Sequence, residues 1–294
     1  MHLTEQDILK RVRQIEIKTR GLSDEIFAGK YHSAFRGRGM SFAEVREYRV
    51  GDDVRDIDWN VTARSERTHV KVFEEERELT MMLIVDVSPS RMFGSKEFTK
   101  KNVITEIAAT LAFSAAKNND KVGCILFSDK VEKFIPPKKG RAHVMMIIRE
   151  LVGFEPTGTS TNISEALRYL VGVNKKRATT FLLSDLINAE SDMAKLDDAL
   201  KIASSKHDIM AIRVYDERDR ELPNVGIVEV VDSETGRREW LDTSSRAVRN
   251  FWRDNYDERT TAMRTLLQQN RVDRADVATG EDYVVELIKM FKQR

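Results

Sequence analysis

The sequence has very little cysteine, almost no excess of charge and no long apolar run. Its one cysteine, Cys124, lies inside the run "KVGCILF", which excludes a disulfide framework and indicates a buried thiol in a reducing compartment. Lys and Arg number 49 and Asp and Glu 48, so the net charge of +1 offers no basis for binding nucleic acid. No segment approaches the roughly 20 apolar residues of a membrane-spanning helix, and no signal peptide is recognisable. We expect a soluble, cytoplasmic protein that does not insert into a membrane.

From Leu79 to the end of the chain, short apolar runs alternate with longer stretches whose apolar residues recur at helical spacing. The apolar runs predict buried strands over residues 79–87, 121–128, 178–185 and 208–216. The longer stretches predict helices over residues 99–118, 141–154, 162–173 and 194–207. Alternation of strands and helices is typical of a mostly parallel sheet covered by helices on both faces. The predicted fold is therefore α/β and Rossmann-like.

The remaining segments of this part of the chain add further elements. The run "VEKFIPP" can pair with residues 121–128 as a hairpin, and residues 226–241 predict a second hairpin that turns at "SETG". A long helix is predicted over residues 244–270, followed by a short strand and a closing helix.

The first 78 residues have a different character. Their apolar content is thin and their glycines cluster, so we expect one opening helix over about residues 6–19 and then short strands and loops. We therefore divide the chain into an N-terminal segment, residues 1–78, and an α/β domain, residues 79–294.

Charges of alternating sign fill the end of this N-terminal segment. The charged residues that stand out are Arg46, Asp52, Asp53, Arg55, Asp56, Asp58, Arg64 and Glu76. Pairs of arginine and carboxylate can hold a loop-rich segment together through bidentate hydrogen bonds, so we expect an ion-paired network. A second metal centre built from the four aspartates is the alternative, and it is disfavoured because the interleaved arginines would compete for the carboxylates.

A carboxylate and several hydroxyls follow the ends of two predicted strands. Asp86 ends the first strand, with Ser88 and Ser90 at alternate positions after it, and Asp185 ends another strand. Ligands of open parallel sheets collect at the carboxyl ends of the strands. A third polar segment, "EPTGTST", lies between two predicted helices. These hard oxygen donors favour Mg²⁺, with Mn²⁺ or Ca²⁺ as alternatives.

The Asp-x-Ser-x-Ser spacing resembles the metal-ion-dependent adhesion site of von Willebrand factor A-type domains. The positions that match the three loops of that site are Asp86, Ser88, Ser90, Thr161 and Asp185. The resemblance implies that the serines and the threonine bind the metal directly or through water and that the aspartates mostly orient water. It also implies an open coordination position for an acidic side chain of a partner, since a dication with mostly neutral ligands remains electrophilic.

Three alternatives remain open at this site. Thr159 or Ser160 could take the place of Thr161, because the register of a hydroxyl-rich loop does not follow from one sequence. Arg91 stands where the adhesion site usually has a methionine, and it could repel the cation or guard an empty site. The serines could instead cap the following helix, with Asp185 merely ending a strand.

A second resemblance covers the charged stretch. Its residues are Tyr48, Gly51 to Asp53, Arg55, Ile57 to Trp59, Ala63 with Arg64, and Glu76 with Arg77. In order and spacing they resemble the bacterial family known as "domain of unknown function 58". The resemblance implies association with MoxR-type AAA+ ATPases and with membrane-anchored von Willebrand A-type proteins. Many members carry two N-terminal membrane helices, which this sequence lacks, so a soluble version is expected.

The sequence favours a non-enzymatic protein-interaction module over an enzyme. It has no phosphate-binding loop of the Gly-x-x-x-x-Gly-Lys type and no Gly-x-Ser-x-Gly elbow, and no paired nucleophile and base is recognisable. We therefore predict no catalytic residue and no organic cofactor. One alternative is a metal-dependent phosphoesterase that uses Asp52 and Asp53 as well to activate water. Another is a scaffold in which Arg91 has replaced the metal.

Overall fold

The chain divides into two compact units, of which residues 35–79 form one and residues 1–34 with 80–294 form the other. The computed structural model describes residues 10, 13–15, 41–65, 67–74, 79–94, 99–187, 193–231 and 237–293. Of the helix predicted over residues 6–19, the described residues 10 and 13–15 are helical and the others lie outside the description.

The smaller unit is built on a two-stranded antiparallel sheet. Its elements are β1 (Ser41–Glu47), the 3-10 helix η1 (Val54–Asp56), α3 (Trp59–Thr62) and β2 (His69–Glu74). Aspartates start both short helices: Asp53 accepts a hydrogen bond from the backbone N–H of Arg55, and Asp58 accepts from Asn60 and Val61. Short strands and loops were predicted here, and the structure confirms them.

An arginine–carboxylate pair joins β1 to the turn that follows it. Arg46 donates two hydrogen bonds of 2.7 Å to the two carboxylate oxygens of Asp52. Hydrogen bonding by Arg46 lowers the pKa of Asp52 to about 2. The prediction of ion pairing is confirmed for this pair, whereas Asp53 and Asp58 act as helix caps. Glu76 and Arg77 lie outside the described residues.

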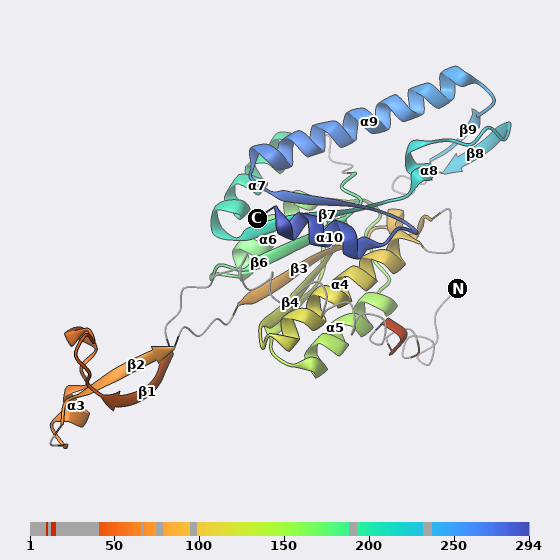
Figure 1. The fold of residues 1–294 in the computed structure, drawn as a ribbon. Helices are drawn as coiled ribbons and strands as arrows, with labels where there is room; N and C mark the ends of the chain where they lie inside the picture. The colour runs from red at the N-terminus through yellow and green to blue at the C-terminus, as the bar shows by residue number, and fades with distance from the viewer. Residues whose placement is uncertain are drawn as a thin grey trace. The chain divides into compact units, whose positions relative to one another are not determined.

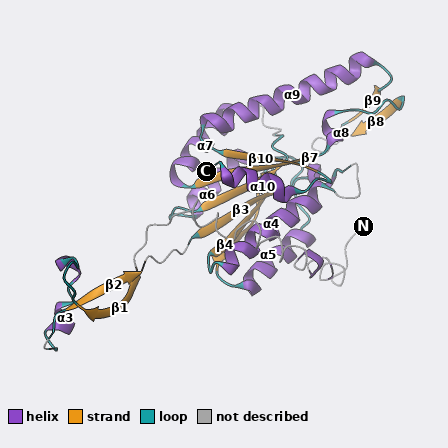
Figure 2. Ribbon diagram, in the orientation of Figure 1, coloured by secondary structure: helices purple, strands orange, loops and turns teal. Residues whose placement is uncertain are grey.

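The described residues of the larger unit include a six-stranded sheet with the strand order β10-β7-β6-β3-β4-β5. Figure 2 shows strands in orange and helices in purple. Its strands are β3 (Thr80–Asp86), β4 (Lys121–Phe127), β5 (Val131–Lys138), β6 (Thr179–Ser184), β7 (Asp208–Tyr215) and β10 (Asp273–Ala278). All neighbouring pairs are parallel except β4 and β5, which form the predicted hairpin. The mostly parallel α/β fold is therefore confirmed.

Helices cover both faces of this sheet (Figure 1). They are α4 (Lys100–Lys117), α5 (Arg141–Gly153), α6 (Ile163–Val173), α7 (Met193–Lys206), α9 (Arg246–Gln269) and α10 (Tyr283–Lys292). Helices α6, α7 and α9 share one apolar core with Met82 and Ile84 of β3. On the other face, Phe181 of β6 packs edge to face on Phe291 of α10, with ring centroids 6.1 Å apart.

The central strand β3 is buried on both faces. Met81 to Val85 are all fully buried, which explains why the sequence shows an unbroken apolar run rather than an alternating one. Cys124 on β4 is buried as well, as predicted, and burial raises the pKa of its thiol. The run ends at Asp86, which places a carboxylate at the edge of the sheet.

In the sequence, a small substructure follows β7 and precedes β10. It consists of α8 (Glu217–Arg220), β8 (Ile227–Val231), β9 (Arg238–Asp242) and the start of α9. Strands β8 and β9 pair antiparallel as the predicted second hairpin, and its predicted turn lies within residues 232–236, outside the description. Within the described ranges, no helix combines the length and apolar character needed to cross a membrane.

Candidate functional site

The carboxyl ends of β3 and β6 bring two of the predicted site residues together. The two strands are parallel neighbours, Asp86 is the last residue of β3, and Asp185 directly follows β6. The hydroxyl of Ser184 donates a 2.6 Å hydrogen bond to Oδ2 of Asp86. The end of β6 is therefore tied to Asp86, as expected for side chains at one edge of a parallel sheet.

Ser88 and Ser90 lie beside Asp86. The backbone N–H of Ser88 donates to Oδ1 of Asp86 at 2.9 Å, and the hydroxyls of Ser88 and Ser90 are hydrogen-bonded to each other at 3.0 Å. Ser88 precedes the 3-10 helix η2 (Pro89–Met92), but its side chain makes no capping hydrogen bond. The alternative in which the serines cap the following helix is wrong for Ser88, and the helix predicted after it, α4, is capped by Thr99. The Ser88 hydroxyl is directed to Ser90 instead.

The hydroxyl-rich loop is attached to the same edge of the sheet through the end of β4. The backbone N–H of Val87 donates to the carbonyl of Phe127, and that of Asn162 donates to the carbonyl of Ser128, both at 2.8 Å. Thr161 is thereby held near the end of the strand that pairs with β3. Its side chain is 1% exposed and its hydroxyl has no hydrogen-bond partner.

Thr161 differs in this respect from the neighbouring hydroxyl residues. Thr159 is exposed and Ser160 is half-buried. Of the three residues that the sequence left open, Thr161 alone combines burial with an unpartnered hydroxyl.

Glu132 of β5 fixes the course of this loop. Its Oε1 accepts hydrogen bonds from the backbone N–H groups of Thr157 and Gly158 and from the hydroxyl of Ser128, at 2.7–3.0 Å. Burial would raise the pKa of Glu132, but these hydrogen bonds outweigh it and lower the pKa. Gly158 suits this close approach, because a Cβ there would lie 2.1 Å from Oγ of the buried Ser128.

The carboxylate of Asp86 is in a low-dielectric position. It is 2% exposed, and burial raises its pKa to about 6, with a further contribution from the negative charge of Asp185. Hydrogen bonds from Ser184 and Ser88 act in the opposite direction. A cation beside Asp86 would favour its ionised form.

Arg91 connects the hydroxyl-rich loop to the segment that follows β3. Its guanidinium is buried, and Nη2 donates a 2.7 Å hydrogen bond to the carbonyl of Phe154, where the hydroxyl-rich loop begins. Burial lowers the pKa of Arg91 to about 10, and Asp86 partly offsets this. Arg91 thus has a positioning role that the sequence did not indicate, and it also adds positive charge to the neighbourhood of Asp86.

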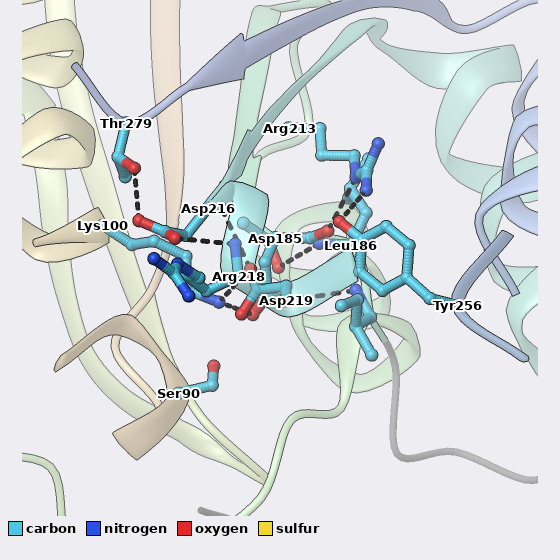
Figure 3. A network of polar contacts seen from close by, with 12 residues as sticks. Ser90, Lys100, Asp185, Leu186, Arg213, Asp216, Arg218, Asp219, Tyr256 and Thr279 are labelled. Carbon is cyan, nitrogen blue, oxygen red and sulfur yellow. Dashed lines mark hydrogen bonds and ion pairs between the residues drawn. The ribbon is translucent and has the colours of Figure 1, made fainter. Parts of the chain in front are cut away.

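Lys100 holds the carboxylate of Asp185. It is the first residue of α4, and its Nζ lies 3.1 Å from Oδ2 of Asp185 and 3.1 Å from Oδ2 of Asp219 in α8 (Figure 3). The other oxygen of Asp185 accepts from the backbone N–H of Ile187 at 3.1 Å. Sequence reasoning missed this contact, because nothing in the pattern separates Lys100 from Lys101 and its partners lie 85 and 119 residues away.

Arg213 holds the backbone of Asp185 from the other side. Its Nε donates to the carbonyl of Asp185 at 3.3 Å, and its guanidinium also donates to the hydroxyl of Tyr256 on α9 (Figure 3). The guanidinium carbon lies 4.7 Å from the ring centre of Tyr215 and 5.3 Å from that of Tyr256. This contact, too, had no signal in the sequence.

The donor set fits a hard divalent cation. Hydrogen bonds place the hydroxyls of Ser88 and Ser90 beside the buried carboxylate of Asp86, and Asp185 is close enough to affect the pKa of Asp86. The unpartnered hydroxyl of Thr161 belongs to the loop that is attached to the end of β4. Among the described residues, no group of three or more His, Cys, Asp or Glu side chains is placed to hold a metal. The candidate site therefore offers mostly neutral oxygen ligands and few charged ones.

The fold and this edge of the sheet define an α/β protein with a polar site at the carboxyl ends of its central strands. A family model described as "Protein of unknown function DUF58" matches residues 44–263. The chain belongs to this family, which confirms the resemblance of the charged stretch.

Two bacterial relatives of the chain carry the name "uncharacterized protein". An uncharacterized protein of Mycobacterium tuberculosis is 30% identical over 227 residues, which are 76% of this chain and 70% of the relative. The uncharacterized protein YeaD of Bacillus subtilis is 28% identical over 109 residues, which are 37% of this chain and 25% of the relative.

Similar solved structures include proteins with von Willebrand factor A domains. The conserved hypothetical protein BatB of Bacteroides thetaiotaomicron has a TM-score of 0.47 at 12% identity, covering 73% of this chain and 98% of that protein. A von Willebrand factor type A protein of Catenulispora acidiphila has a TM-score of 0.43 at 10% identity, covering 77% of this chain and 43% of that protein.

Proposed function

We propose that the protein is a non-enzymatic interaction module that binds a partner protein through a divalent cation at the ends of β3 and β6. The residues that would hold the cation are Asp86, Ser88, Ser90 and Thr161, with Asp185 orienting water. Mg²⁺ is the preferred ion, and Mn²⁺ or Ca²⁺ could replace it. Bound among mostly neutral oxygens, such an ion stays electrophilic and attracts a carboxylate from a partner.

The observation that carries this proposal is the state of the Thr161 hydroxyl. A buried hydroxyl without a hydrogen bond costs about 1–3 kcal/mol of stability. Thr161 has such a hydroxyl in a loop that Glu132, Arg91 and the end of β4 hold in place. A bound ion or a water would satisfy such a hydroxyl, and we propose an ion at Thr161 because its loop is attached to the end of β4, the strand next to β3.

The phosphoesterase alternative has less support. It would use Asp52 and Asp53, but both oxygens of Asp52 are held by Arg46, and Asp53 caps η1. No described contact directs either carboxylate toward a reacting group, so we develop the interaction module alone.

The partner we propose follows from the family resemblance. Proteins that resemble this chain are linked to MoxR-type AAA+ ATPases and to membrane-anchored von Willebrand A-type proteins, and we propose a MoxR-type ATPase as the partner. The interaction would take place in the cytoplasm.

The test is a calorimetric titration of the full chain with Mg²⁺. The parent protein is expected to bind one ion, and Asp86→Asn is expected to lose binding because the substitution removes the charge while keeping the shape. Asp52→Asn serves as the matched control, since Asp52 is also a hydrogen-bonded carboxylate but lies in the smaller unit. Absence of heat in the parent, or equal binding in Asp86→Asn, would contradict the metal site.

The partner needs a separate assay. Purified MoxR-type ATPase should be retained by the immobilised chain in Mg²⁺ and released by a chelator. Retention that is indifferent to the chelator and to Asp86→Asn would show that the ATPase binds elsewhere.

A further inference from the structure

Lys100 places a positive charge of the protein itself at the candidate site. The side chain is 3% exposed, and its ammonium bridges Asp185 and Asp219 at 3.1 Å each (Figure 3). A lysine is rarely so buried unless it is paired, because removing an ammonium from water costs several kcal/mol.

The ammonium stays charged in this position. Burial would lower the pKa of Lys100, but the negative charges of Asp185 and Asp219 outweigh burial and raise it. The carboxylate of Asp185 is thus already paired with a cation of the protein, and both of its oxygens have a donor from the protein.

We propose that Lys100 is a resident cation of the site, which keeps Asp185 from binding the divalent ion directly and so leaves Asp86 as the one anionic ligand from the protein. The inference rests on the proposed function and adds what sets the strength of metal binding. With Asp185 paired to Lys100, the ion is held less tightly but keeps more positive charge for a carboxylate of the partner. Lys100 is therefore a positioning residue that weakens metal binding and strengthens binding of the partner.

Asp219 is the second carboxylate that contacts Lys100, and its effect on metal binding can be tested separately. Its carboxylate shares the ammonium of Lys100, and Oδ2 also accepts from the backbone N–H of Asp216 at 3.0 Å. Its carbonyl accepts from Nε1 of Trp252 on α9 at 2.9 Å, so Asp219 is fixed from two sides. Removing the charge of Lys100 would free Asp185 for the metal, whereas removing the charge of Asp219 would leave the whole ammonium to Asp185.

The two substitutions should therefore shift Mg²⁺ affinity in opposite directions. In calorimetric titrations with MgCl₂, Lys100→Met is expected to lower the Kd by about tenfold or more, and Asp219→Asn is expected to raise it by about threefold or more. Lys100→Arg should keep an affinity near that of the parent, since it keeps the charge. Lys201→Met is the matched control, because Lys201 forms an exposed ion pair with Asp197 on α7.

The outcomes separate this inference from the proposed function. If the parent binds Mg²⁺ and Lys100→Met binds it with the same Kd or more weakly, Lys100 is not a resident cation, and the metal site stands. If the parent does not bind and Lys100→Met does, Lys100 is the resident cation, and the proposed metal-dependent function fails. If neither binds, both fail.

A folding control keeps the test decisive. Lys100→Met leaves two buried carboxylates without a cation, so circular dichroism must show that the variant is folded. If it is not, the double variant Lys100→Met/Asp219→Asn keeps the net charge of the cluster and should bind Mg²⁺ more tightly than Asp219→Asn. Equal or weaker binding by the double variant would overturn the inference.

Discussion

Replacing Thr161 with valine separates a ligand from an ordinary buried residue. Valine has nearly the shape of threonine, so the substitution exchanges the unpartnered hydroxyl for a methyl group in the same space. If Thr161 only fills space, the variant should gain stability and nothing else should change. If Thr161 holds a cation, the variant should gain stability without Mg²⁺ and lose the stabilisation that Mg²⁺ provides.

The two effects have sizes that an unfolding experiment resolves. Removing a buried hydroxyl that lacks a partner relieves about 1–3 kcal/mol, and each kcal/mol raises the melting temperature by roughly 2–4 °C for a unit of this size. In the parent, Mg²⁺ at about 100 times its Kd adds about 2.7 kcal/mol. Thr161→Val should therefore melt above the parent without metal and show little further rise with MgCl₂.

Thr180→Val is the matched control. Thr180 lies inside β6, is fully buried, and also has a hydroxyl without a hydrogen-bond partner. It should show the same gain in stability and keep the full response to Mg²⁺. Thermal unfolding of the three proteins with MgCl₂ and with chelator decides the question. An undiminished Mg²⁺ response in Thr161→Val would refute the role of this hydroxyl.

Two further predictions concern the loop and the pH dependence of stability. Gly158→Ala should destabilise by roughly 1–3 kcal/mol in urea unfolding, because its Cβ would lie 2.1 Å from Oγ of the buried Ser128, which is hydrogen-bonded to Glu132. Gly172→Ala, whose Cβ would meet nothing within 4 Å in α6, should instead stabilise by up to about 1 kcal/mol, and equal effects would contradict the loop geometry. Burial, with help from Lys206 and Arg177, lowers the pKa of His207 below 6.5, so below that pH the unfolded chain binds a proton that the folded chain does not. The contribution of His207 to stability should therefore fall as the pH drops below about 6.5, whereas Asp86, whose pKa is raised to about 6, contributes in the opposite direction. His207→Leu should lose the His207 contribution, and an unchanged slope in that variant would refute the role of this residue.

The sequence predicted the larger unit well because its four central strands, β7, β6, β3 and β4, are buried on both faces. Residues such as Met81 to Val85 form apolar runs that only a central parallel strand explains, and the runs end where polar side chains meet the edge of the sheet. The positions of Asp86 and Asp185 at one edge followed from this rule.

Features that depend on long-range packing could not be predicted from the sequence pattern. Among the hydroxyl residues before α6, burial singles out Thr161, and this depends on the bond between Asn162 and the end of β4. Lys100 and Arg213 contact Asp185 from α4 and β7. The sequence pattern does not distinguish a buried basic residue from an exposed one, so these contacts could not be predicted. The metal itself stays a prediction.

A crystal grown with Mn²⁺ in place of Mg²⁺ tests the central claim most directly, through an anomalous difference map that locates the ion. We expect one peak in bonding contact with the carboxylate of Asp86 and with the hydroxyls of Ser88, Ser90 and Thr161, with the ammonium of Lys100 still on Asp185. A map with no peak among these hydroxyls would contradict the account.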